Sequence, residues 1–166
     1  MFIADYLLQL FIGWPPELAT FFLAMIPIGE LRLAIPVSIA AYHLAPWEAF
    51  VWSVAGNMVP VAFILFFAER FNKWVEKNSG FLFGKAWVRY LRRAQEKFAK
   101  DYEKYGLIGL AIFVGIPLPL TGAFTGALAA FVFGIPMRKA MPYIFAGVIM
   151  AGLITLFLTV GAVKVF

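Results

Sequence analysis

Two apolar stretches of this chain have lengths that do not suit a single crossing of a membrane, and both are broken by prolines. They cover residues 18–45 and 107–135, which makes them 28 and 29 residues long. A helix crosses the hydrocarbon core in about 20 residues, so each stretch is long for one crossing and too short for two. Each can instead supply two arms of roughly 14 residues, which is typical of a re-entrant hairpin.

The two broken stretches also resemble each other. When they are aligned without gaps, Pro27 falls on Pro117 and Pro46 falls on Pro136. Paired broken segments in the two halves of a membrane protein are the best sequence indication of a transporter's binding site. The spacing therefore predicts an internal repeat that contains the functional site.

The other two apolar stretches, residues 47–68 and 140–163, are each long enough to span the membrane. The chain is 63% hydrophobic and 14% charged, whereas soluble domains are about half apolar and a quarter charged. We therefore predict an all-α integral membrane protein with one membrane domain, residues 1–166. Its repeat halves are residues 1–68 and 106–166, and in each half a re-entrant hairpin precedes a transmembrane helix.

Charge is concentrated in the connector between the halves, residues 69–105. This connector holds ten of the fourteen Lys and Arg residues and five of the nine acids, which is the whole net charge of +5. The positive-inside rule places such a block in the cytoplasm. A nucleic-acid site is not expected in a loop between apolar segments.

Part of the connector has the pattern of an amphipathic helix, because apolar residues recur every three or four positions from Trp87 to Tyr105. Basic residues lie mostly between them, and we expect Arg89, Arg92 and Arg93 to contact lipid headgroups at the interface. In the alternative interpretation, this helix packs on the protein's own cytoplasmic face and its charges are solvated.

Arg138 and Lys139 distinguish between the topologies. If each broken stretch were a full span, these residues would lie opposite the basic connector, against the positive-inside rule. Re-entrant hairpins return them to the connector's side and make the two halves inverted in topology. Irregular backbone inside a membrane must be covered by protein or line a wet cavity. We therefore expect a homo-oligomer, with a dimer favoured.

Glu30 and Arg32 are the only ionisable residues deep within an apolar stretch. Buried charges in membranes usually mark a pathway or a binding site. We expect a tip unwound at Gly29 and flanked by Pro27 and Pro36, where Glu30 carries a proton and Arg32 binds an anionic group such as phosphate. The alternative is a structural pair that only holds the fold.

The second tip carries no charge. Pro117 and Pro119 are predicted to break the helix there, and Thr121, Gly122 and Thr125 are candidates for substrate binding. A half-helix that starts near Thr121 would direct backbone N–H groups at an anion.

Several small residues have a simpler interpretation as helix contacts. Gly122 and Gly126 match a GxxxG packing face, and Gly147 and Gly152 are also expected at close helix contacts. Asn57 is predicted to support the site by a hydrogen bond to a hairpin tip.

Composition excludes several chemistries. There is no cysteine and a single histidine, His43, so thiolate metal sites and histidine-built metal sites are not expected. No nucleophile and base pair is visible. We therefore expect neither an enzyme nor a bound metal or cofactor.

Two motifs can be compared with known families. They read Glu30-x-Arg32-x-Ala34-Ile35-Pro36 and Pro117-x-Pro119-x-Thr121-Gly122-Ala123-Phe124-x-Gly126. Over nearly its whole length the chain resembles the small multidrug export protein family, which is distantly related to the DedA family. It departs from the pattern at Leu120, where glycine is expected, and at Ser38, where glycine often follows the first motif.

The resemblance implies a transporter in the plasma or inner membrane of a prokaryote. DedA relatives imply proton-linked handling of lipid phosphates, such as undecaprenyl phosphate, with Glu30 in the proton role and Arg32 in the phosphate role. The family name implies an alternative, a multidrug or cation exporter in which Glu30 pairs with the cation. A third hypothesis is a non-transporting scaffold that organises lipids.

Overall fold

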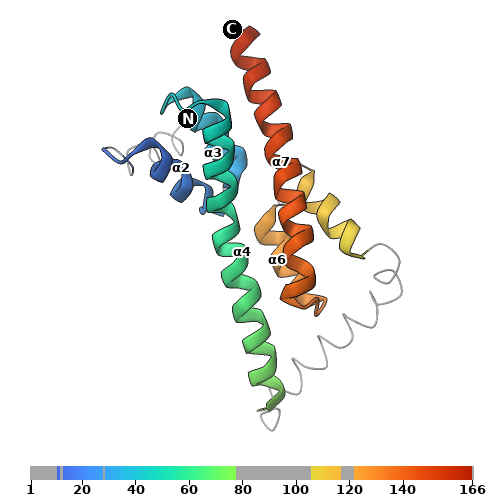
Figure 1. Cartoon of the computed structure of the whole chain (residues 1–166). Helices are drawn as coiled ribbons and strands as arrows, with labels where there is room; N and C mark the ends of the chain where they lie inside the picture. The colour runs from blue at the N-terminus through green and yellow to red at the C-terminus, as the bar shows by residue number, and fades with distance from the viewer. Residues whose placement is uncertain (1–10, 12, 28, 78–105, 117–121, 166) are drawn as a thin grey trace. The chain divides into compact units, whose positions relative to one another are not determined.

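The computed structural model describes residues 11, 13–27, 29–77, 106–116 and 122–165 (Figure 1). The regular structure within these residues is α-helical, which confirms the predicted class. The helices are α2 (Pro16–Ala24), α3 (Glu30–Ala40), α4 (Pro46–Lys77), an apolar helix at Gly106–Gly115, α6 (Ala123–Val132) and α7 (Met137–Val165).

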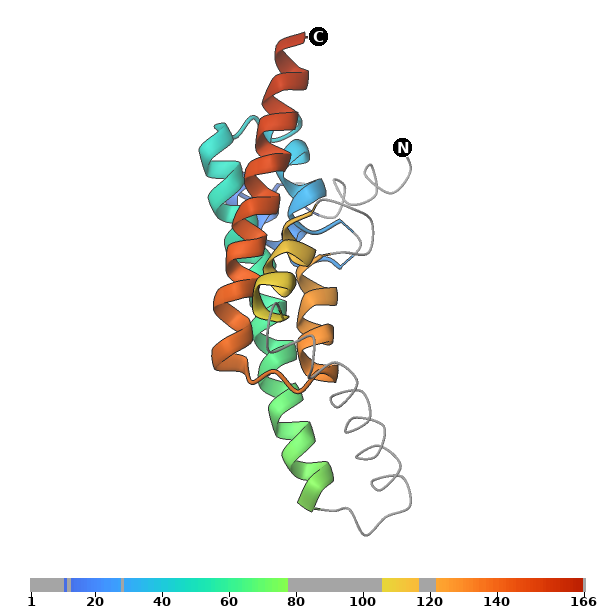
Figure 2. The ribbon, with the colours of Figure 1, turned by 90° about the vertical axis from the view of Figure 1, so that its right-hand side faces the viewer.

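Helices α4 and α7 are long and continuous (Figure 2). Pro46–Ala68 of α4 and Met137–Ala162 of α7 contain 23 and 26 residues and are apolar enough to cross a membrane. They coincide with the two segments that the sequence predicts to span the membrane, 47–68 and 140–163. α4 continues past its apolar part to Lys77, so the charged connector begins within a helix.

Each broken stretch folds into two short helices instead of one long one. The first contains α2 and α3, which pack against each other, and the second contains Gly106–Gly115 and α6. Helices of 9 to 11 residues are too short to span the hydrocarbon core. This agrees with the predicted pair of arms, while the re-entrant path and the inverted repeat stay predictions.

The chain divides into two compact units. The first unit comprises residues 1–59 and 149–166, and the second comprises residues 60–148. Both boundaries fall inside long helices, at Pro60 of α4 and after Val148 of α7.

Small residues bring helices close together in the first unit. Ala19 and Ala24 of α2 and Ala34 of α3 share one buried apolar cluster with Leu23. Helix α4 approaches α2 at Gly56, where any Cβ would collide with the carbonyl group of Phe21. In membranes such close backbone approach supplies the packing energy that lipid cannot.

The second unit is built around Val114 of the Gly106–Gly115 helix. A Cβ at Gly147 would lie 2.7 Å from the Val114 Cβ and 2.6 Å from the Ala111 carbonyl oxygen, and one at Gly126 would collide with the Val114 side chain. These contacts confirm the packing interpretation of Gly126 and Gly147. Gly152 makes a similar contact in the first unit, 2.7 Å from the Phe50 ring.

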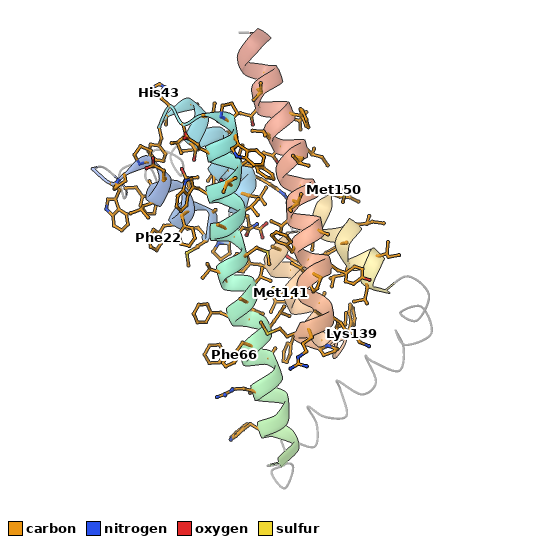
Figure 3. All side chains as sticks on the ribbon, in the orientation of Figure 1. Phe22, His43, Phe66, Lys139, Met141 and Met150 are labelled. Atoms are coloured by element: carbon orange, nitrogen blue, oxygen red, sulfur yellow. The ribbon has the colours of Figure 1, made fainter. Side chains whose placement is uncertain are left out.

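Large apolar side chains cover the outer surfaces of the long helices. Phe63 and Phe67 of α4 and Phe157 and Leu158 of α7 are all exposed, and Phe66 points away from α4 (Figure 3). In water this much exposed apolar surface would favour aggregation. This exposed surface and the two candidate spans agree with the predicted membrane protein.

Some of the predicted site residues lie outside the described residues. These are the hairpin prolines Pro117 and Pro119, the hydroxyl residue Thr121, and the headgroup residues Arg89, Arg92 and Arg93.

Gly147→Ala is expected to lower the free energy of unfolding by about 1 to 3 kcal/mol, because its Cβ would press on the Ala111 backbone. Thermal unfolding in detergent, followed by circular dichroism, measures the change. Gly109→Ala is the matched control, since a Cβ at Gly109 meets no atom within 4 Å and alanine favours helix. Equal midpoint shifts for the two variants would contradict the packing account.

Candidate functional site

The break between α2 and α3 places the two candidate charges. At the end of α2 the backbone hydrogen bonds span three residues instead of four. The Met25 N–H donates to the Phe22 carbonyl (3.1 Å) and the Ile26 N–H to the Leu23 carbonyl (3.2 Å), so this turn is narrower than an α-helical one. Pro27 has no N–H with which to continue the helix. The Glu30 N–H then donates to the Ile26 carbonyl at 3.0 Å, and α3 begins at Glu30.

Glu30 combines burial with an unusual backbone conformation. Its side chain is only 7% exposed, and its φ angle is +49°. The left-handed region costs a residue with a Cβ about 1 to 2 kcal/mol. Strain of this kind is found more often at functional sites than elsewhere. The position thus holds a buried carboxylate at a cost in conformational energy.

Arg32 lies two residues further on, in the first turn of α3, and is half-buried. Its guanidinium and the Glu30 carboxylate attract each other. The arginine is therefore the more accessible member of an oppositely charged pair. A charge that enters this region from outside reaches Arg32 more easily than Glu30.

The structure separates the three residues that are expected to form the first tip. Pro27 and Gly29 lie in the break, with Gly29 directly before α3, whereas Pro36 lies inside α3. A proline inside a membrane helix is tolerated because neighbouring groups can satisfy the backbone that it leaves unpaired. The unwound segment therefore ends before Glu30.

A pair of buried hydroxyl groups joins α2 to α3. The Oγ1 atom of Thr20 and the Oγ atom of Ser38 are 2.6 Å apart, and both residues are fully buried. Each hydroxyl also lies within hydrogen-bond distance of a carbonyl of its own helix, at 2.7 Å from Pro16 and 2.6 Å from Ala34. Each hydroxyl has one hydrogen, so while one donates across to the other helix, the other donates within its own.

This pair fixes the position of α3, and with it Glu30 and Arg32, relative to α2. In the sequence Ser38 stands out only as a departure from the family pattern, and nothing adjacent to it indicates Thr20 as its partner. One signal was available: Thr20 and Ser38 lie nine residues before and nine residues after Gly29. In a hairpin that turns at Gly29, equal spacing brings two such residues opposite each other.

The described candidates of the second tip lie at the start of α6. Gly122 is the N-cap of α6 and is extended (φ −108°, ψ −173°), and its carbonyl accepts the Gly126 N–H at 2.9 Å. Thr125 is half-buried in the first turn. Helix α6 thus begins two residues after Thr121, and substrate binding by Gly122 and Thr125 stays a prediction.

Helix α4 contributes two further buried polar side chains, Ser53 and Asn57. Both are fully buried, and neither has a hydrogen-bond partner among the described residues. The predicted bond from Asn57 to a hairpin tip stays open, because residues 28 and 117–121 lie outside the described part. Ser53 was not singled out from the sequence.

Within the described part of the chain, no group of three His, Cys, Asp or Glu residues could hold a metal ion. Glu30 and Arg32 are the charged side chains at the break between α2 and α3.

Comparison with known proteins places the chain in a family. Residues 30–154, about three quarters of the chain, match the family described as "Putative small multi-drug export protein". The chain belongs to this family. The matched region begins at Glu30 and includes Arg32, α4 and most of α7. The family description indicates that the chain is a membrane protein of export type. No curated protein and no solved structure matches the chain significantly.

The hydroxyl pair should be energetically coupled. We expect Thr20→Val and Ser38→Ala each to destabilise the protein, and the double variant to be less destabilised than the sum by about 0.5 to 2 kcal/mol. Thermal unfolding of the four proteins in detergent measures the coupling. Thr159→Val is the control, because its hydroxyl donates within α7, to the Thr155 carbonyl. Additive effects would show that the 2.6 Å contact contributes nothing.

Proposed function

We propose that the chain is a proton-coupled secondary transporter of the cell membrane, whose substrate carries an anionic, lipid-like head group. One observation carries this proposal: the buried Glu30 carboxylate is held at a helix break beside the more accessible Arg32 guanidinium. Membership of an export family supports transport, and the substrate class comes from the chemistry of the pair.

The pair offers a direct coupling mechanism. In the empty protein, Arg32 is the countercharge of the Glu30 carboxylate. An anionic head group that binds Arg32 replaces Glu30 as its partner. A buried carboxylate without a countercharge is costly, so Glu30 takes up a proton. Substrate and proton then bind together, and for a head group that carries one negative charge the net charge of the pair with its ligands is zero before and after.

The position of α3 supports this mechanism. The Thr20–Ser38 contact fixes α3, which carries both charges, against α2. The left-handed backbone at Glu30 restricts where its side chain can go. The backbone positions of Glu30 and Arg32 therefore stay fixed while Arg32 changes its partner, and binding sites require such fixed positions.

The proposal also gives roles to the second broken stretch, to the connector and to a second copy of the chain. Thr121, Gly122 and Thr125 would bind the substrate through hydroxyl and backbone N–H groups, as half-helix termini do in other transporters. Arg89, Arg92 and Arg93 would contact anionic headgroups at the cytoplasmic surface. A homodimer would cover the irregular backbone of the two hairpins.

A multidrug or cation exporter is the second candidate, and the family description favours it. Here Glu30 would bind a cation and Arg32 would compete with that cation for the carboxylate. The two candidates predict opposite effects of removing Arg32. Its loss weakens binding of an anionic head group, whereas it strengthens binding of a cation.

Transport in proteoliposomes tests the proposal. We compare the flipping of a labelled lipid phosphate with the efflux of a cationic dye at pH values from 5 to 8. We expect wild type to flip the lipid phosphate faster under an inward proton gradient, and Arg32→Ala to lower the rate by about tenfold or more. Glu30→Gln should retain transport and lose the pH dependence.

Glu17→Gln is the matched control for Glu30, because it makes the same change at the half-buried Glu17 in the first turn of α2. If Glu30→Gln keeps the wild-type pH dependence, Glu30 is not the proton carrier. If dye efflux occurs and Arg32→Ala increases it, the cation exporter replaces the proposal. Transport of neither substrate would leave the proposal without support.

The hairpin topology can be tested separately, because the chain has no cysteine. Single cysteines at Ala45 and Arg138, both exposed, should react differently with a reagent that does not cross the membrane. We expect Ala45→Cys to be labelled from outside the cell, and Arg138→Cys to be labelled only after permeabilisation. Labelling of Arg138→Cys in intact cells would contradict re-entrant hairpins.

A further inference from the structure

Helix α4 continues well beyond its apolar part. The apolar part ends at Ala68, and the helix ends at Lys77. A helix rises about 1.5 Å per residue, so this extension is about 13 Å long. The headgroup region of a bilayer is about 5 to 8 Å thick on each side. With the apolar part in the hydrocarbon, residues 69–77 therefore cross the level of the lipid headgroups.

Exposed aromatic side chains form one face of this end of α4. Four of them recur at spacings of four, four and three residues, which places them on one side of the helix: Phe63, Phe67, Phe71 and Trp74. These four residues, the α4 aromatic face, are between 45% and 62% exposed. The rings of Phe71 and Trp74 stack at 6.3 Å between centroids, past the apolar part of the helix. Exposed aromatic rings at this level are typical of a membrane interface.

Arg70 lies on the same side of the helix, because it follows Phe66 and precedes Trp74 by four residues. Its guanidinium carbon is 4.9 Å from the centroid of the Phe66 ring, which points away from α4 (Figure 3). Basic side chains at the end of a membrane span usually extend toward water. Phe66 lies one turn nearer the apolar part, so the Arg70 charge is instead held at the boundary between hydrocarbon and headgroups.

The contact with Phe66 leaves the hydrogen-bond donors of Arg70 available. A cation–π contact involves the face of the ring, whereas a guanidinium has five N–H donors. The described side chains of the second unit include no carboxylate that could accept these bonds. At the level of the headgroups the acceptors are water and lipid phosphates, and arginine binds phosphate through two parallel N–H bonds. A lipid phosphate therefore matches Arg70 in both charge and geometry.

A second helix holds the α4 aromatic face in position. The rings of Phe71 and of Phe131 in α6 meet at 6.3 Å between centroids and an angle of 65°. Both residues belong to the second unit. The face is therefore part of a packed structure, and binding sites require such support.

We propose that Arg70 and the α4 aromatic face bind one anionic phospholipid of the membrane. The lipid phosphate would accept two N–H bonds from Arg70, and the acyl chains would lie along Phe63 and Phe67. In a zwitterionic phospholipid the ammonium of the headgroup would compete with Arg70 for the phosphate, so the site prefers a lipid with a net negative charge. The site uses no residue of the transport proposal, and its lipid is a bound ligand, not the transported substrate.

A second copy of the chain fits this face less well than a lipid does. In a symmetric dimer the same surface of both copies meets. Arg70 lies within the face, so a dimer would bring two guanidinium groups together away from water. Such charges are costly without a partner, and the described side chains of the second unit include no acid to neutralise them.

Native mass spectrometry of the purified full chain in detergent tests the site, because it counts bound lipids. Phosphatidylglycerol and phosphatidylcholine with the same acyl chains are titrated separately. We expect wild type to bind one phosphatidylglycerol about tenfold more tightly than phosphatidylcholine. Arg70→Gln should weaken phosphatidylglycerol binding by about tenfold and leave phosphatidylcholine binding unchanged.

Arg138→Gln is the matched control, because it removes the same charge from another exposed arginine of the second unit. It should change phosphatidylglycerol binding by less than about twofold. Phe66→Leu keeps an apolar side chain but removes the ring beneath the guanidinium, so it should weaken this binding by about two- to fivefold. Arg70→Lys should have an effect between those of wild type and Arg70→Gln, since lysine keeps the charge and lacks the two parallel donors.

Equal affinity of wild type for the two lipids would overturn the site. An effect of Arg138→Gln as large as that of Arg70→Gln would overturn it as well, since it would show only a general attraction between charges. The chain has no cysteine, so disulfide cross-linking of Trp74→Cys in native membranes would place a second copy on this face and also contradict the proposal.

If Arg70→Gln does not fold, Arg70→Lys and Phe66→Leu decide the outcome. Lipid binding is measured without transport, so the two proposals can fail separately. Phosphatidylglycerol binding without transport of either substrate would count against the proposed function alone.

Discussion

Close approach of helix backbones at glycine is the constraint on which the described fold depends. Lipid offers an apolar helix as good a surface as another helix does, so helices associate only where they pack more closely than lipid can. Gly56 lies against the Phe21 carbonyl in the first unit, and Gly126 and Gly147 enclose Val114 in the second. The amide on α4 lies on the helix that makes the Gly56 contact, and the hydroxyl pair holds α3, with its charged pair, against α2.

The two units differ in the chemistry of their interiors. Among the described residues, the buried polar and charged side chains are Thr20, Glu30, Ser38, Ser53, Asn57 and Thr155, and all belong to the first unit. The described interior of the second unit is apolar. Buried polar groups in a membrane are costly and mark function. Among the described residues, the first unit therefore contributes the buried polar side chains.

Features determined by local sequence could be predicted, and features determined by contacts between distant residues could not. The spanning helices follow from apolar length, and the break at Pro27 and Gly29 follows from the loss of an N–H and a Cβ. The contact between Thr20 and Ser38 has no local signal, because neither residue is unusual in its own helix. Helical spacing also places Ser53 and Asn57 on one face, but only the structure shows that both are buried, with no hydrogen-bond partner among the residues it describes.

The left-handed backbone at Glu30 has a consequence for protein engineering. Glycine or asparagine would adopt a φ of +49° more easily, so glutamate is a poor choice for the fold at this position. A screen for thermostable variants, run without an activity assay, would therefore tend to select replacements of this residue. Such variants would be well suited to crystallisation and would have lost the carboxylate. Under the proposed function, the same replacement would raise stability and remove the proton carrier.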